Sequence, residues 1–157
     1  MKITLKDGSV KEYGQSMAVI DVARDLSEGL ARAATCAKVD GEVKDLRTVL
    51  DKDCELEILT FDSEEGKGAF NHTASHIMAQ AVKRLYPETK LAIGPSIANG
   101  FYYDLDRETP FTTEDLEKIE AEMKKIVKED LKLERFTRSR DEAVAYFKEK
   151  EEPYKVE

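Results

Sequence analysis

The sequence predicts an α+β protein built from two small units in tandem. Three observations indicate this organisation: short strand patterns surround one amphipathic helix in the first sixty residues, a polar segment with two glycines follows, and a long helical pattern opens the remainder. A chain of 157 residues suffices for one ordinary domain or two small ones. We therefore expect a first unit at 1–61, a linker at 62–68 and a second unit at 69–157. The linker either separates the two units or runs into the next helix.

The first unit begins with the pattern of a β-hairpin and continues into a helix. Ile3 and Leu5 alternate with polar residues, and Asp7-Gly8 favours a tight turn. Ser16 is the candidate N-cap of the helix. Five apolar residues would share one face of that helix: Val19, Val22, Ala23, Leu26 and Leu30.

A second hairpin and a final strand complete the first unit. Strand patterns at 36–39 and 42–44 flank Asp40-Gly41, an apolar patch at 46–50 favours a turn or short helix, and 54–60 alternates as a strand. This order of strands around one helix is typical of a small β-grasp, or ubiquitin-like, fold.

The second unit is organised around a helix that starts near Glu64 or Lys67 and stops before Pro87. Its apolar stripe comprises Phe70, Ala74, Ile77, Met78, Ala81, Val82 and Leu85. His72 and His76, one turn apart, lie on nearly the opposite face beside the small residue Ala79. We expect these histidines, which are the only two in the chain, to line an open cleft.

The region after this helix has the pattern strand, loop, strand. Residues 91–93 and 101–105 are the strand candidates, with Gly94 and Gly100 at the sharp turns between them. Tyr102 and Tyr103 are neighbours in the second strand, so one ring should face inward and the other outward.

Two helices with capping boxes are predicted next. Thr112 with Asp115 opens the first, and Ser139 with Glu142 opens the second. The predicted core stripe of the first is Leu116, Ile119, Met123, Ile126, Val127 and Leu131, and the inward residues of the second are Ala143, Val144 and Phe147. Weak strand patterns are present at 132–137 and at 154–157.

Composition excludes several classes of protein. The chain is 41% hydrophobic and 37% charged, as in soluble globular proteins, and no apolar run approaches the roughly 18 residues of a membrane span. A net charge of −8 argues against gripping nucleic acid by bulk electrostatics. Cys36 and Cys54 lack metal or redox spacing, so we expect reduced thiols in a cytoplasmic protein.

Histidines at positions i and i+4 of a helix can present two nitrogens to one metal or one substrate. The chain offers no third histidine, and no glutamate follows His72 as a metalloprotease pattern requires. His72 and His76 are thus weak metal candidates, and the plain alternative is two surface histidines. Lys155, taken alone, is one solvated lysine among many.

Three segments resemble bacterial-type threonyl-tRNA synthetases: His72-Thr73-Ala74-Ser75-His76, Ile93-Gly94-Pro95 and Asn99-Gly100-Phe101-Tyr102-Tyr103-Asp104. The first sixty residues, including Ile3-Thr4-Leu5-Lys6-Asp7-Gly8-Ser9, resemble the TGS domain of that family. The resemblance implies the N-terminal part of an enzyme that joins threonine to its tRNA, with residues 69–157 forming part of an editing domain. That domain hydrolyses serine wrongly attached to threonine tRNA.

The resemblance also implies roles for single residues. His72, His76 and Lys155 would be catalytic in editing, and Tyr103 and Gly94 would contact the substrate. The other half of the family's editing site, a Cys-x-x-x-His segment, is expected beyond Glu157. ATP, magnesium and zinc are expected only in a synthetic core outside this chain. The contacts that form a homodimer are also expected outside it. This chain should therefore be inactive in aminoacylation and need no cofactor. Its expected partner is the acceptor end of threonine tRNA. We expect no association with a membrane.

Two alternatives remain open. The His-x-x-x-His helix also fits a free-standing, zinc-dependent editing hydrolase of the alanyl type. The β-grasp unit also fits a binding or regulatory module.

Overall fold

The computed structural model describes residues 1–156 and divides the chain into two compact units. The division falls between Asn71 and His72. It therefore lies inside one long helix, α3, which spans Glu64–Leu85.

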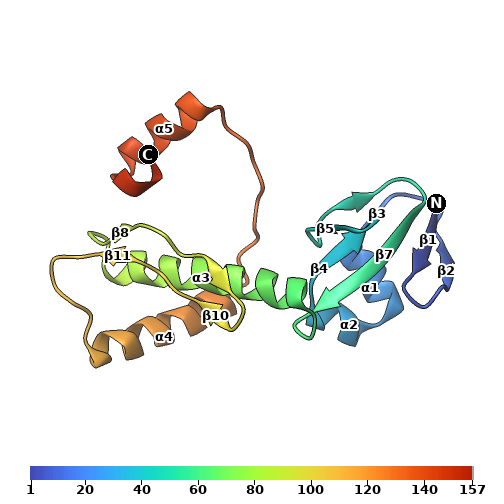
Figure 1. Ribbon diagram of the computed structural model, residues 1–157, viewed down its shortest axis with the longest axis horizontal. Helices are drawn as coiled ribbons and strands as arrows, with labels where there is room; N and C mark the ends of the chain where they lie inside the picture. The colour runs from blue at the N-terminus through green and yellow to red at the C-terminus, as the bar shows by residue number, and fades with distance from the viewer. Residues whose placement is uncertain (157) are drawn as a thin grey trace. The chain divides into compact units, whose positions relative to one another are not determined.

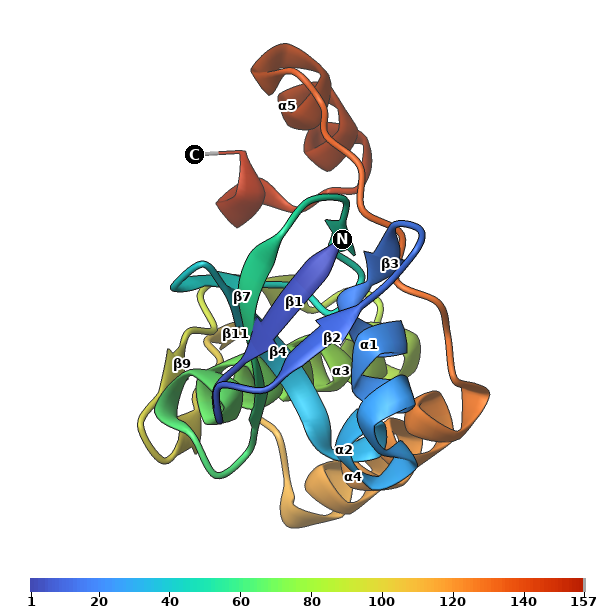
Figure 2. The same cartoon turned by 90° about the vertical axis from the view of Figure 1, so that its right-hand side faces the viewer.

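The first unit contains a five-stranded sheet in the order β2-β1-β7-β4-β5, visible in Figures 1 and 2. The strands are Lys2–Leu5 (β1), Val10–Glu12 (β2), Ala34–Val39 (β4), Glu42–Lys44 (β5) and Cys54–Thr60 (β7). β1 and β7 run parallel with Ile3 opposite Cys54, and the other pairs are antiparallel. Both predicted hairpins and the predicted final strand are confirmed.

Two short helices, α1 (Val19–Leu26) and α2 (Glu28–Ala33), accompany this sheet, and α1 supplies the helical side of its core. Figure 2 shows α1 lying beside the sheet. The buried core consists of Ile3, Val19, Val22, Ala37, Leu50, Cys54 and Leu56. Apolar residues from the helix and from alternate strand positions thus meet in one layer, which confirms the predicted β-grasp class.

Ser16 does not cap the first helix, contrary to the prediction. The N-cap is Ala18, which makes no side-chain capping bond. Two residues, Met17–Ala18 (β3), pair with Val49–Leu50 (β6), so the chain is extended up to the start of the helix. The amides of Val19 and Ile20 donate to the carbonyl oxygens of Thr48 and Leu46, at 3.0 and 2.8 Å. Two backbone carbonyls thus accept the hydrogen bonds that the hydroxyl of Ser16 was predicted to accept. The apolar patch at 46–50, predicted as a turn or short helix, ends in the short strand β6.

The helix also ends earlier than its apolar stripe suggests. Ser27 is extended, with φ of −169°, and its hydroxyl accepts hydrogen bonds from the amides of Gly29 and Leu30. Ser27 therefore ends α1 and caps α2, because its side chain satisfies amides that a new helix leaves unpaired. Leu30 accordingly belongs to the second helix.

The polar segment at 62–68 is helical from Glu64 onward. The hydroxyl of Ser63 accepts from the amide of Gly66 at 3.1 Å. The carbonyl of Gly66 accepts from the Thr35 hydroxyl at 2.9 Å, and a Cβ at position 66 would lie 1.9 Å from the carbonyl oxygen of Thr60. The glycine is therefore explained by close packing against the end of β7.

The second unit pairs α3 with α4, which spans Thr113–Glu129, as Figure 1 shows. Ala81 and Val82 meet Ile119 and Ile126 in its buried core. Partly buried residues around them include Ile77, Met78, Leu85 and Met123. The predicted stripes of both helices are confirmed at these positions.

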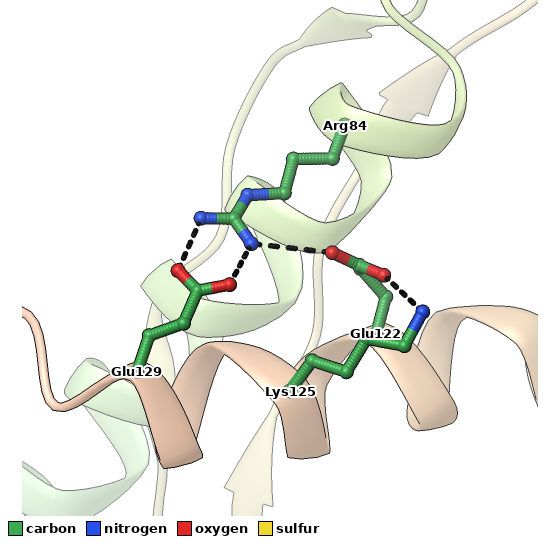
Figure 3. A network of polar contacts seen from close by, with 4 residues as sticks. All are labelled: Arg84, Glu122, Lys125 and Glu129. Carbon is green, nitrogen blue, oxygen red and sulfur yellow. Dashed lines mark hydrogen bonds and ion pairs between the residues drawn. The ribbon is translucent and has the colours of Figure 1, made fainter.

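Arg84 joins the polar edges of the two helices (Figure 3). Its two terminal nitrogens lie 2.7 and 2.8 Å from the two carboxylate oxygens of Glu129, and Nη1 lies 3.2 Å from Glu122. Glu122 also accepts from Lys125 at 3.2 Å. A planar guanidinium matches a carboxylate in this two-bond arrangement, which fixes how the helices meet.

Three residues of the predicted α4 stripe are on the surface. Leu116 is 58% exposed, Val127 is 62% exposed and Leu131 is 52% exposed. Within the described residues, α4 packs against α3 along a stripe narrower than the sequence pattern indicates. Phe70, at the start of the α3 stripe, is also exposed and meets the ring of Phe61 edge-on at 5.1 Å.

The strands of the second unit are shorter than predicted. Lys90–Leu91 (β8) pairs with Leu105–Asp106 (β11), and Ser96–Ile97 (β9) pairs with Gly100–Phe101 (β10). Tyr102 and Tyr103 therefore lie between β10 and β11, outside any strand.

The last part of the described chain corrects two strand predictions. Residues 132–137 have no regular structure, and they follow Asp130, whose left-handed backbone ends α4. Ser139 caps α5 (Arg140–Glu149) in the predicted capping box. A single 3-10 turn, η1 (Pro153–Lys155), replaces the predicted strand because the ring of Pro153 presets a helical φ. Glu157 lies outside the described residues.

Candidate functional site

The two histidines of α3 are in direct contact. Their Nε2 atoms are 3.0 Å apart, and their ring planes cross at 83°. Helical geometry places positions 72 and 76 one turn apart on one face, which is exposed. At this distance one ring nitrogen donates a hydrogen bond and the other accepts it. At least one imidazole of the pair is therefore neutral.

His76 has a lowered pKa. The main cause is the partial loss of water around the ring, followed by the neighbouring His72 and by the positive charge of Lys155. Each of these disfavours the charged imidazolium. His76 is consequently neutral at pH values where an ordinary histidine begins to protonate, and it can accept a proton.

Lys155 thus acts on His76 although 79 positions separate them in the sequence. The lysine is the last residue of η1, and the histidine lies in the middle of α3. Of the three residues for which the resemblance implies catalysis, His72 and His76 are in contact, and the charge of Lys155 contributes to the lowered pKa of His76.

Gly94 and Tyr103, the two residues implied to contact substrate, also contact each other. A Cβ placed on Gly94 would lie 2.3 Å from Cδ2 of the Tyr103 ring. Hydrogen bonds between Asp104 and the backbone of Ala92 and Ile93, at 3.0 and 2.7 Å, hold the two segments side by side. The ring of Tyr103 is half-buried, and that of Tyr102 is exposed.

The predicted space beside Ala79 is not open. Ala79 is buried by other parts of the protein. Four cavities among residues 1–156 are each lined by residues other than His72 and His76. The pair therefore lies on an exposed helix face.

The histidine pair does not form a metal centre by itself. No group of three or more His, Cys, Asp or Glu side chains among residues 1–156 is arranged to hold a metal ion. Two imidazoles that are hydrogen-bonded to each other fall short of the three or four ligands of a zinc site. Cys36 and Cys54 are buried free thiols in the first unit, and burial raises the pKa of both.

Sequence reasoning missed one functional candidate, Glu152. Its side chain is buried and paired with Lys83. In the sequence it is one of several glutamates at the end of a helical pattern, and nothing local distinguishes it. Its importance comes from what surrounds it in three dimensions.

Comparison with known proteins shows which proteins this chain is similar to. Residues 1–60 match the TGS domain family. All 157 residues are 63% identical to a threonine–tRNA ligase of Acetivibrio thermocellus, 59% to one of Clostridioides difficile and 57% to one of Caldanaerobacter subterraneus. The chain is similar over its whole length to the N-terminal region of threonine–tRNA ligases.

The matches confirm the resemblance seen in the sequence. The chain spans about a quarter of the length of these ligases: 25% of the first two and 24% of the third. In its second unit lie the histidine pair, Lys155 and the Gly94–Tyr103 contact. No helix among residues 1–156 is both long and apolar enough to cross a membrane.

Proposed function

We propose that this chain is the N-terminal part of a cytoplasmic threonyl-tRNA synthetase and that its second unit carries half of an editing site. That site would remove serine from mischarged threonine tRNA. One observation carries the proposal: His72 contacts His76, and the charge of Lys155 helps to lower the pKa of His76. The chain in which this occurs is similar to threonine–tRNA ligases over its whole length.

The need for such a site follows from the chemistry of the two amino acids. Serine lacks one methyl group of threonine, and a difference of that size is worth only about 1–3 kcal/mol in a binding pocket. A second, hydrolytic site therefore improves accuracy.

Within this site the histidine pair provides a base. Neutral His76 accepts a proton from a water molecule, and its contact with His72 holds both rings in one orientation. The ammonium of Lys155 stabilises negative charge that develops as the ester is attacked. Tyr103, placed by Gly94, contacts the terminal nucleotide or the seryl group.

The remaining parts belong to the longer enzyme. ATP, magnesium and zinc act in its synthetic core, and the homodimer forms through domains outside residues 1–157. The acceptor end of threonine tRNA is the partner of the editing site. A Cys-x-x-x-His segment after residue 157 completes that site.

The test is a His76→Ala substitution in the full-length enzyme. Hydrolysis of Ser-tRNA should slow by about a hundredfold, the lower range for loss of a positioned base, while threonine activation stays unchanged. Lys118→Ala, which removes an exposed pair with Glu114 on α4, is the matched control. Unchanged hydrolysis in the His76→Ala enzyme would reject the proposed role.

A further inference from the structure

A buried carboxylate holds the turn that carries Lys155. Glu152 is only 7% exposed, and its two oxygens have different partners. Oε1 lies 2.7 Å from Nζ of Lys83 in α3, and Oε2 accepts a hydrogen bond at 3.2 Å from the amide of Leu91 in β8. A carboxylate is stable in such surroundings only when its charge is paired and its oxygens are bonded. Glu152 therefore ties the start of η1 to two distant elements.

Lys83 is itself held in place. Besides its contact with Glu152, its ammonium donates to the carbonyl oxygens of Pro87 and Thr89, at 2.8 and 3.0 Å. An ammonium group has three donors, and here each has a partner. Glu152 thus meets a cation whose position is set by α3 and by the loop that follows it.

The turn after Glu152 is held at two further points. The amide of Lys155 donates to the carbonyl oxygen of Glu152 at 3.1 Å. The hydroxyl of Tyr154 donates to Asp106 in β11 at 2.9 Å. The position of Lys155 is thereby linked to that of Glu152 through one hydrogen-bonded turn.

The spacing on α3 matches this arrangement. His76 and Lys83 are seven residues apart, so they lie on the same helix face two turns from each other, about 10 Å along the axis. Glu152 meets Lys83 at one end of this stretch, and Lys155 acts on His76 at the other. Among the described residues, the charged or titratable groups that act on His76 are His72 on α3 and Lys155 on η1.

We propose that Glu152 is a positioning residue: its ion pair with Lys83 holds η1 against α3 so that the ammonium of Lys155 faces His76. The inference rests on the proposed editing role for its functional meaning, but the arrangement itself can be tested without any activity. Glu152 acts through Lys155, and it does not contact the reacting atoms.

The test follows the two imidazole rings by NMR, since His72 and His76 are the only histidines in the chain. Ring signals are titrated in the unsubstituted chain, in Glu152→Gln, in Lys155→Met and in the double variant. Lys155→Met should raise the pKa of His76 toward its ordinary value by removing a positive charge. Glu152→Gln should raise it as well, and the double variant should show no further rise beyond Lys155→Met.

A second pair of variants guards against trivial effects. Lys83→Met should reproduce the rise seen in Glu152→Gln and should speed amide hydrogen exchange at Tyr154 and Lys155. Glu120→Gln, which removes an exposed pair with Lys124 on α4, is the control and should change neither quantity. Should Glu152→Gln fail to fold, Glu152→Asp keeps the charge, shortens the reach and should give a smaller rise.

One result overturns the proposal: a folded Glu152→Gln chain in which the pKa of His76 is unchanged while Lys155→Met still raises it. Failure of the editing proposal looks different. In that case the NMR coupling persists, and His76→Ala in the full-length enzyme leaves Ser-tRNA hydrolysis intact.

Discussion

The backbone of Gly94 lies directly against the ring of Tyr103. An added Cβ would come within 2.3 Å of the ring, well inside van der Waals contact. The two residues are nine positions apart, and hydrogen bonds between the flanking segments hold them together. The position of the Tyr103 ring therefore depends on the absence of a side chain at position 94.

Gly94→Ala should displace the Tyr103 ring and destabilise the second unit by about 1–3 kcal/mol, the usual cost of overpacking. Urea unfolding measures the loss, and the chemical shifts of the tyrosine ring report its movement. In the full-length enzyme, hydrolysis of Ser-tRNA should fall as well. An unmoved ring with unchanged stability would contradict the close contact.

Two glycines in the first turns of α3 should respond in opposite directions. Gly66→Ala places a methyl group 1.9 Å from the carbonyl oxygen of Thr60, so the backbone must shift and stability should fall by about 2 kcal/mol or more. Gly68→Ala meets nothing within 4 Å and should raise stability by up to about 1 kcal/mol, because alanine favours helix. Chemical denaturation of both variants under the same conditions measures the two changes in stability. Equal changes would argue against the close packing of Gly66 on Thr60.

The two-bond contact between Arg84 and Glu129 should be sensitive to a conservative substitution of the arginine. Arg84→Lys keeps the charge but loses the two parallel bonds to Glu129, so we expect a lower free energy of unfolding. Lys124→Met removes an exposed pair on the same helix as the control and should stay within about 0.5 kcal/mol. If Arg84→Lys lowers the free energy of unfolding no more than Lys124→Met does, the contact between Arg84 and Glu129 does not hold α3 and α4 together.

Asp115 should contribute to stability in acid. Its hydrogen bonds with Thr112 and Tyr86, together with the charge of Arg107, lower its pKa to about 2. A lowered folded-state pKa stabilises the fold above the unfolded-state value near 4, and that contribution disappears as the pH falls from about 4 to about 2. Thermal unfolding of the unsubstituted chain and of Asp115→Asn, followed from pH 5 to pH 2, should therefore show a shallower decline in the variant. Parallel curves would contradict the assignment.

Local patterns were sufficient for most of the first unit and for the two capping boxes of the second unit. The hairpin turns at Asp7-Gly8 and Asp40-Gly41 and the capping boxes at Thr112 and Ser139 depend on neighbours in sequence, and all are present as expected. Ser16 failed as a cap because the carbonyl oxygens of Leu46 and Thr48 accept from the helix amides of Ile20 and Val19 instead, across 26 and 29 positions of the sequence. No local rule reports a partner at that distance.

The sequence by itself determined the two-unit α+β organisation, the helix that presents His72 and His76 together, and the resemblance to the N-terminal region of threonine–tRNA ligases. Periodicity, turn chemistry and motif spacing are local properties and can be read along the chain. Only the tertiary structure decided that Lys155 acts on His76, that Tyr103 packs on Gly94, and that Glu152 is buried against Lys83. The physical reason is that burial, close contact and charge interaction depend on which distant segments come into contact. A local pattern along the sequence does not show those contacts.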